Sequence, residues 1–414
     1  KKPIIKYWLF FCLLSLKHKR KLPVKKRFIL SVSFLPYLIV CSVNAEENFS
    51  NYKQYNLTKT NYNLETIAKP FDHPWALTFI DDKNLIVTEK GGGLFKVNIE
   101  NGSKNPIKHN IEHITYDGGS IAYSQGGLLD VYFNSQDGYI YFTYSHDFKE
   151  LYIDGKPKKN SSTAIARGRL AGDQIENLEV LLVAEPRLPT NLHFGSRISI
   201  QNDFLYAGFG ERNEGMIAQD PTKHPGSIIR IKTNGDIPKD NPKFHGNGTW
   251  LPEIYTIGIR NPQGIAISPH DGEVYFSSHG PRGGDHIGKV KLGANYGWKD
   301  IAWGGTEYSF LGIGDKPFKD KYEKPIKTWV PSMAIGSIQF YNGSVFPEWQ
   351  GDLIVSSLNG QSLIRLDYEN NTIVGEEIIF KNKIGRIRDF EIDKKGNIYL
   401  ISDSPNSSLW KLSN

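Results

Sequence analysis

The chain has 414 residues, with 50 lysines and arginines against 44 aspartates and glutamates, which gives a formal net charge of +6. The positive excess is confined to residues 1–45, which hold ten basic residues and no acidic ones. The remaining 40 basic and 44 acidic residues give a net charge of about −4. A nucleic-acid-binding domain needs a basic patch of its own, so the composition argues against that class of function.

Residues 1–45 are expected to form a leader with an export signal. Lys25, Lys26 and Arg27 precede an apolar run over residues 28–43, and residues 43–45 are typical of a cleavage site. The run is shorter than the roughly 20 residues that span a bilayer. We therefore expect cleavage without stable membrane insertion, and a periplasmic or secreted protein. A further hypothesis places residues 1–21 upstream of the true start.

Both cysteines, Cys12 and Cys41, fall within this leader. The remainder, residues 46–414, is long enough for one large all-β domain or two ordinary ones. It is expected to contain no disulfide and no thiolate metal site.

A motif recurs six times in this remainder: a short apolar strand, a turn with Asp, Asn or Gly, and a second apolar strand. The copies begin at Leu77, Val131, Ile198, Ile265, Ile338 and Phe390. Such strands indicate antiparallel sheet, and their repetition indicates a propeller. We predict an all-β fold: one six-bladed β-propeller of four-stranded antiparallel blades, with residues 55–68 adding a strand to the last blade. A pair of β-sandwiches is the alternative, but it does not explain six matching units.

Three long insertions are polar or rich in glycine: residues 146–163, 210–225 and 279–310. The first is predicted to be a surface loop. Long ordered loops on a rigid scaffold often carry binding sites, and we expect these to crowd around the central channel on one face.

Four residues carry the chemistry expected at this channel. His193 precedes the inner strand of the third copy, where a neutral imidazole could accept a proton from a substrate hydroxyl. Arg260, Arg386 and Arg388 precede strands of different copies and could converge on the axis. Because arginine binds carboxylates through a planar fork, convergence would indicate a polyanionic ligand. The alternatives are a structural histidine and surface ion pairs.

Two turns are weaker candidates. Gln125 could hydrogen-bond a carbonyl-rich ligand, and the two glycines after it allow close approach of backbone. Gly280 and Pro281 present backbone carbonyls, which suit a hard cation such as Ca²⁺. Ordinary turns are the alternative for both.

Over about residues 65–414, the sequence resembles the soluble aldose sugar dehydrogenases that depend on pyrroloquinoline quinone (PQQ), in the glucose/sorbosone dehydrogenase family. The motifs that carry the resemblance lie at residues 73–77, 125–130, 193–197, 218–220, 260–264, 279–285, 295–298, 346–349 and 385–389. Their number and order make the match specific.

The resemblance implies a six-bladed propeller that binds PQQ and Ca²⁺ and oxidises aldoses at C1 to lactones. By motif, His193 would be the general base, and the carbonyls of Gly280 and Pro281 would bind the catalytic Ca²⁺. PQQ is a planar tricarboxylate, which would account for converging arginines. The residues implied to hold it are Gln125, Arg260, Asn261, Tyr308, Arg386 and Arg388. The expected partners are an aldose and an electron acceptor, either the respiratory chain or a soluble carrier, with the protein a monomer or dimer.

The sequence departs from the family at two places. A second, structural Ca²⁺ site would involve Tyr296, but His286 stands where the family usually has an acidic residue. Some members place a lysine against the cofactor in a region that here reads residues 357–361, without lysine; Gln361 is the candidate substitute.

Two other functions remain open for a propeller of this kind. A Ca²⁺-dependent sugar lactonase would need carboxylate and amide side chains around an axial metal. A non-catalytic propeller that binds glycan or protein would not need an arginine cluster beside His193.

Overall fold

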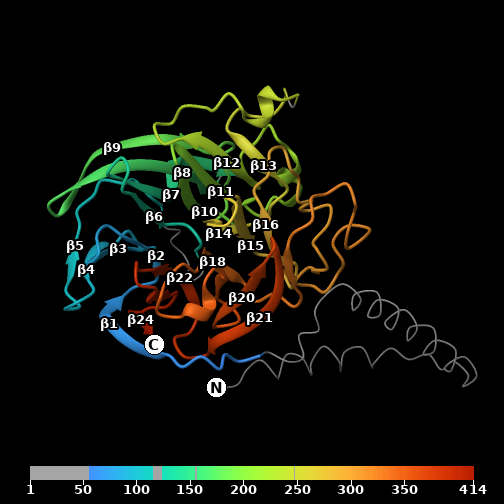
Figure 1. Cartoon of the computed structure of the whole chain (residues 1–414). Helices are drawn as coiled ribbons and strands as arrows, with labels where there is room; N and C mark the ends of the chain where they lie inside the picture. The colour runs from blue at the N-terminus through green and yellow to red at the C-terminus, as the bar shows by residue number, and fades with distance from the viewer. Residues whose placement is uncertain (1–55, 115–123, 154–155, 247) are drawn as a thin grey trace, which may run out of the picture. The chain divides into compact units, whose positions relative to one another are not determined.

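The computed structural model describes residues 56–414 except 115–123, 154–155 and 247; of residues 147–159 only the backbone is described. These residues form six four-stranded antiparallel sheets, arranged as blades around a central axis (Figure 1). The predicted six-bladed propeller is therefore confirmed. The leader predicted for residues 1–45 lies outside the described residues. Within the described part, no helix is long and apolar enough to cross a bilayer.

The strands follow the ring in chain order. The first three blades consist of β2 (Pro74–Phe79), β3 (Asn84–Glu89), β4 (Leu94–Asn98) and β5 (Lys104–Pro106); β6 (Leu128–Asn134), β7 (Tyr139–Ile153), β8 (Lys156–Ala171) and β9 (Gln174–Val183); and β10 (Gly195–Gln201), β11 (Phe204–Phe209), β12 (Ser227–Lys232) and β13 (Ile254–Ile257). The next two consist of β14 (Pro262–Ile267), β15 (Val274–Ser278), β16 (Asp285–Lys289) and β17 (Lys327–Trp329); and β18 (Ile335–Phe340), β19 (Leu353–Ser357), β20 (Ser362–Glu369) and β21 (Thr372–Lys381). In the described part of the chain, three short 3₁₀ helices lie in the loops: η2 (Gly215–Gln219), η3 (Pro242–Phe244) and η4 (Pro347–Trp349).

The sixth blade joins the two ends of the described chain. It contains β22 (Ile387–Ile392), β23 (Ile398–Ser402), β24 (Ser407–Ser413) and, as its outermost strand, β1 (Asn63–Phe71). Asn63 pairs with Ser413 and Leu64 with Leu412. The predicted closing strand is thus present, although it begins later than expected. Closure removes the free edge that an open sheet would expose.

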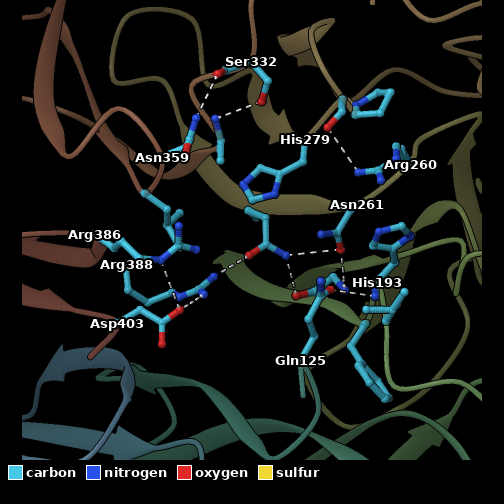
Figure 2. A pocket seen from close by; sticks show the side chains of 18 of the residues that line it. Gln125, His193, Arg260, Asn261, His279, Ser332, Asn359, Arg386, Arg388 and Asp403 are labelled. Atoms are coloured by element: carbon cyan, nitrogen blue, oxygen red, sulfur yellow. Dashed lines mark hydrogen bonds and ion pairs between the residues drawn. The ribbon is translucent and has the colours of Figure 1, made fainter. Parts of the chain in front are cut away.

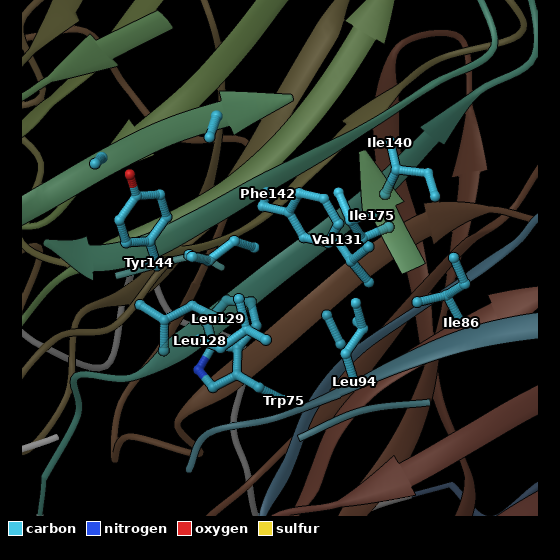
Figure 3. Packing of buried hydrophobic residues seen from close by; sticks show 14 of the residues in the cluster. Trp75, Ile86, Leu94, Leu128, Leu129, Val131, Ile140, Phe142, Tyr144 and Ile175 are labelled. Atoms are coloured by element: carbon cyan, nitrogen blue, oxygen red, sulfur yellow. The ribbon is translucent and has the colours of Figure 1, made fainter. Parts of the chain in front are cut away.

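The second strand of each blade explains the dense apolar runs of the sequence. β15, β19 and β23 are buried along their whole length, because neighbouring blades cover both faces of each sheet. Six apolar clusters lie where blades meet one another. Figure 3 shows the cluster between the first two blades, where Ile86 and Leu94 face Val131 and Phe142. Each fully buried side chain of this size contributes roughly 1.5–3 kcal/mol.

The innermost strands share an irregularity that matters for the site. Every one of the six pairs with its neighbour through a register shift near its first residues, as between Gly195 and Ile198 or between Ile387 and Asp389. Such bulges re-aim side chains. Consequently Ile387 packs into an inter-blade cluster while the next residue, Arg388, lines a cavity at the end of the blade.

One predicted loop is wrong. Residues 146–163 do not form a loop: β7 and β8 continue as a long hairpin, with Asp147 opposite Ser161 and Ile153 opposite Lys156. The polar composition of this stretch argues against burial in the core, but it does not exclude a strand. Backbone pairing between two strands does not require apolar side chains. The insertion at 279–310 also contains a strand, β16.

Candidate active site

A cavity of about 670 Å³ lies where the inner strands begin, on one face of the propeller (Figure 2). All nine residues predicted for proton transfer, cofactor binding and the catalytic Ca²⁺ line it: Gln125, His193, Arg260, Asn261, Gly280, Pro281, Tyr308, Arg386 and Arg388. They come from loops and strand ends of several blades. The antiparallel connections bring these positions together, since each inner strand starts at the same face.

His193 is held in one orientation by a buried carboxylate. Its Nδ1 lies 2.6 Å from Oε1 of Glu211, and both side chains are almost fully buried. The other oxygen of Glu211 accepts the backbone N–H of Gly215 at 2.7 Å. Burial lowers the pKa of His193, although its hydrogen bond to Glu211 opposes the shift. The imidazole is therefore neutral near pH 7, with Nε2 as its second nitrogen, which is the state a general base requires.

Cations dominate one wall of the cavity. Arg388 donates to Asp403 at 2.6 Å and to Oε1 of Gln263 at 3.0 Å. Arg386 lies 3.9 Å from the same Asp403 carboxylate, and Lys90 lies 4.0 Å from it. Across the cavity, Arg260 donates to the carbonyl of Gly280 at 3.2 Å. One carboxylate thus serves three neighbouring cations.

Two nitrogen atoms in this region lack a hydrogen-bond partner among the described residues: Nε2 of His279 and Nε of Arg388, both buried. Burial, with the charges of Arg388 and Arg260, holds the pKa of His279 well below its usual value. A buried polar group without a partner is costly. Excess positive charge and unpaired nitrogens together fit a ligand that brings several anionic oxygens.

Gln125 also holds the loop that carries His193 in place. Its Oε1 accepts the backbone N–H of His193 at 2.8 Å, which fixes the loop that carries the imidazole. Asn261 likewise accepts the N–H of Gly195 at 3.1 Å. Gly127, in the glycine pair after Gln125, has a φ of +149°, and a Cβ there would lie 1.9 Å from the carbonyl oxygen of Lys90. The close approach of backbone expected at these glycines is therefore made at Gly127 by the carbonyl of Lys90.

A buried aspartate shapes the predicted Ca²⁺-binding turn. Asp285 accepts the N–H of Gly280 at 2.7 Å, the hydroxyl of Ser332, and the N–H groups of Met333 and Ala334. Burial raises the pKa of Asp285 to about 6. These bonds hold the loops before β16 and β18 together, with Gly280 and Pro281 on the cavity wall.

A model of the glucose/sorbosone dehydrogenases matches residues 71–411 of the chain. The chain belongs to the glucose/sorbosone dehydrogenase family. It is 32% identical to the aldose sugar dehydrogenase YliI of Escherichia coli (strain K12) over 360 residues, which cover 85% of this chain and 92% of the relative. It is 26% identical to quinoprotein glucose dehydrogenase B of Acinetobacter calcoaceticus over 431 residues, with 83% and 86% covered. A crystal structure of the soluble aldose sugar dehydrogenase from Escherichia coli, in the apo form, superposes with a TM-score of 0.77 at 31% identity over 85% of this chain and 99% of the other.

Tyr296, expected at the second Ca²⁺ site, lies outside the cavity. Its hydroxyl donates to the carbonyl of Lys289 at 2.6 Å, and its ring stacks on His286 with centroids 6.0 Å apart. Burial lowers the pKa of His286 to about 4. Both residues have the contacts of packed core side chains, and the second Ca²⁺ site stays a prediction.

Tyr308 is placed at the cavity edge, with 67% of its surface exposed. In the same loop, the ring of the exposed Phe310 lies under the guanidinium of Arg282, 3.6 Å away. An exposed aromatic at the entrance can contact a ligand that enters but cannot by itself fix one in the interior.

Sequence reasoning missed a set of polar residues that follow the second strand of a blade. They lie one or two positions after β3, β11, β15, β19 and β23, and they are Lys90, Glu211, His279, Asn359 and Asp403. Because the second strand ends beside the start of the first, these positions return to the same face. The signal was available: the repeats, once aligned, carry a polar residue at the same point in five blades.

Proposed function

We propose that this member of the glucose/sorbosone dehydrogenase family is a quinoprotein that uses PQQ and Ca²⁺ to oxidise the C1 hydroxyl of an aldose to the lactone. The observation that carries the proposal is the convergence of nine predicted residues on one cavity, with His193 held by Glu211 opposite a wall of cations. The names of the relatives, an aldose sugar dehydrogenase and a quinoprotein glucose dehydrogenase, support the same class of reaction.

The residues present fit the cofactor. Arg386, Arg388 and Arg260 would hold the carboxylates of PQQ, because guanidinium groups bind carboxylates through paired N–H donors. Gln125 and Asn261 line the same cavity and would contribute amide groups. When bound, PQQ supplies a two-electron acceptor for the C1 hydride, and Ca²⁺ supplies a Lewis acid beside the quinone.

His193 would perform the proton transfer. The aldose would bind with its C1 hydroxyl against Nε2, because Nδ1 is occupied by Glu211 at 2.6 Å. As the hydroxyl proton reaches the ring, the positive charge that develops lies next to the Glu211 carboxylate, which stabilises it. Burial of the pair keeps water from competing for the proton.

The calcium ion would be bound by the carbonyl oxygens of Gly280 and Pro281. Ca²⁺ prefers six to eight oxygen ligands, so two carbonyls are too few, and anionic oxygens of the cofactor would complete the set. The carbonyl of Gly280 also accepts a hydrogen bond from Arg260 at 3.2 Å, so Ca²⁺ would have to bind through the second lone pair of that oxygen.

The lactonase alternative is less well supported. Its chemistry needs several carboxylates and amides around an axial metal, whereas the carboxylate that lines this cavity, Asp403, is hydrogen-bonded by Arg388, and the amides lie among guanidinium, ammonium and imidazole groups. Export by the expected leader would place the reaction in the periplasm or outside the cell, where an unidentified acceptor would reoxidise the cofactor.

Reconstitution tests the proposal. Purified protein with PQQ and Ca²⁺ should reduce a redox dye in the presence of one or more aldoses from a panel, and omission of either PQQ or sugar should stop the reaction. His193→Ala should lower the rate at least 100-fold, on the scale of a lost general base. His245→Ala, at an exposed position outside the cavity, is the matched control. Absence of PQQ binding by the wild type would refute the proposal.

A further inference from the structure

Lys90 occupies an unusual environment for a lysine. It directly follows β3, its side chain is 3% exposed, and it lines the cavity. Its backbone is fixed on both sides: the N–H donates to the carbonyl of His73 at 3.0 Å, and the carbonyl accepts the N–H of Leu128 at 3.2 Å. The close approach of Gly127 adds a third restraint. The ammonium group is therefore held inside the cavity rather than free to extend into solvent.

The charge around Lys90 is not balanced by the protein. The carboxylate nearest to it, Asp403, lies 4.0 Å away and is already hydrogen-bonded by Arg388 at 2.6 Å. Arg386 lies 3.9 Å from the same carboxylate. Three cations thus face one anion, an excess of about two positive charges. Lys90 is buried and Arg388 is largely buried, and buried cations without full compensation are expensive; a site that retains them is suited to binding an anion.

We propose that Lys90 is a cofactor-binding residue, whose ammonium binds an anionic oxygen of the tricarboxylate on the wall that it shares with Arg386 and Arg388. This inference rests on the proposed function. It adds a cofactor contact from the first blade. The sequence has no lysine at residues 357–361, where some family members place one. Gln361, the substitute considered there, is not among the residues that line the cavity.

The titration of Lys90 gives this inference a second signature. Burial lowers its pKa to about 8; Asp403 and Asp72 raise it, whereas Arg388 and Arg386 lower it further. A bound anion favours the protonated amine. Affinity for the anionic cofactor should therefore decrease as the pH rises above about 8, where the empty protein loses this proton.

The test uses full-length protein without cofactor and measures the dissociation constant for PQQ by quenching of tryptophan fluorescence, since Trp75 lines the cavity. A hydrogen bond to a charged group is worth about 1.5–3 kcal/mol. Lys90→Met should therefore raise the dissociation constant by roughly 10–100-fold. Lys90→Arg, which keeps the charge, should bind within a few fold of wild type and should lose the decrease in affinity above pH 8.

Lys104→Met is the matched control. Lys104 is a partly buried lysine of the same blade, paired with Glu89 at 3.1 Å and absent from the cavity lining, so its loss should leave PQQ affinity unchanged. Wild-type affinity in Lys90→Met, in protein that melts cooperatively, would overturn the role of Lys90 alone. A wild type that does not bind PQQ would overturn the proposed function and this inference with it. If Lys90→Met does not fold, the pH profile of Lys90→Arg decides: an unchanged decrease above pH 8 would overturn the inference.

Discussion

Lys90→Met is expected to make the empty protein more stable. The pKa of Lys90 falls from its ordinary 10.5 to about 8 because its ammonium is buried. One pKa unit corresponds to about 1.4 kcal/mol, so the charged form costs the folded state on the order of 3 kcal/mol at neutral pH. Asp403 loses a neighbouring cation in the variant but keeps Arg388 at 2.6 Å. We expect a net gain of about 1–3 kcal/mol in the free energy of unfolding.

The pH dependence of that gain follows from the direction of the shift. Between about pH 8 and 10.5, the unfolded chain binds the Lys90 proton and the folded protein does not, so wild-type stability rises with pH in this window. The gain from Lys90→Met should be full below pH 8 and should vanish above 10.5. Thermal or urea unfolding of cofactor-free protein over this range measures it.

Lys104→Met should have the opposite effect. The Lys104 ammonium donates to the carbonyl of Pro70 at 2.7 Å and lies over the rings of Phe71 and Phe95, at 4.0 and 3.7 Å. Its removal should destabilise the protein at neutral pH. Equal destabilisation by both variants would refute the argument, because it would mean that the Lys90 ammonium stabilises the empty fold.

Three further outcomes are expected. Glu211→Gln should slow aldose oxidation at least tenfold with PQQ affinity within a few fold, and it should move the acid limb of the rate profile to lower pH, because Glu211 raises the pKa of His193. Removal of Ca²⁺ with a chelator should abolish activity, and Ca²⁺ should restore it where Mg²⁺ does not, since Ca²⁺ accepts carbonyl ligands in a less regular geometry than the octahedron that Mg²⁺ demands. The contribution of Asp130 and Glu391 to stability should decrease from about pH 5 to 8, because burial raises the pKa of Asp130 to about 7 and that of Glu391 to about 8, so that these folded carboxyl groups hold protons that the unfolded chain releases. Glu391→Gln should flatten this profile in the same unfolding measurement; an unchanged profile would exclude Glu391 as its source.

The fold was predictable because each blade repeats one local pattern. Strand, turn and strand recur with apolar residues at Ile86, Phe142 and Tyr275, which pack between blades whatever the loops contain. The hairpin of β7 and β8 was not predictable in the same way. The part of this hairpin that extends beyond the blade is paired through backbone hydrogen bonds. A polar sequence without alternating apolar residues gives no indication of such pairing.

The residues of the candidate site also fall into a group that the repeat predicts and a group that it does not. His193, Arg260 and Arg388 stand immediately before or within inner strands, so their convergence follows from the ring. Glu211, Lys90 and Asp403 follow second strands, where a charged residue is indistinguishable from ordinary turn chemistry until the three-dimensional register is known. One of these contacts joins different blades: Lys90 of the first meets Asp403 of the sixth, and no spacing within a repeat encodes that pair.

The pairing of β1 with β24 sets the order in which this protein can finish folding. Asn63 has to find Ser413, so the sixth blade cannot be completed until nearly the whole described chain has left the ribosome. Until then β1 waits as an unpaired strand, and the five earlier blades form an open arc with exposed edges. Contacts between such distant residues slow folding. A nascent chain cut short before β24 would keep those edges, and would be expected to aggregate rather than to form a smaller propeller.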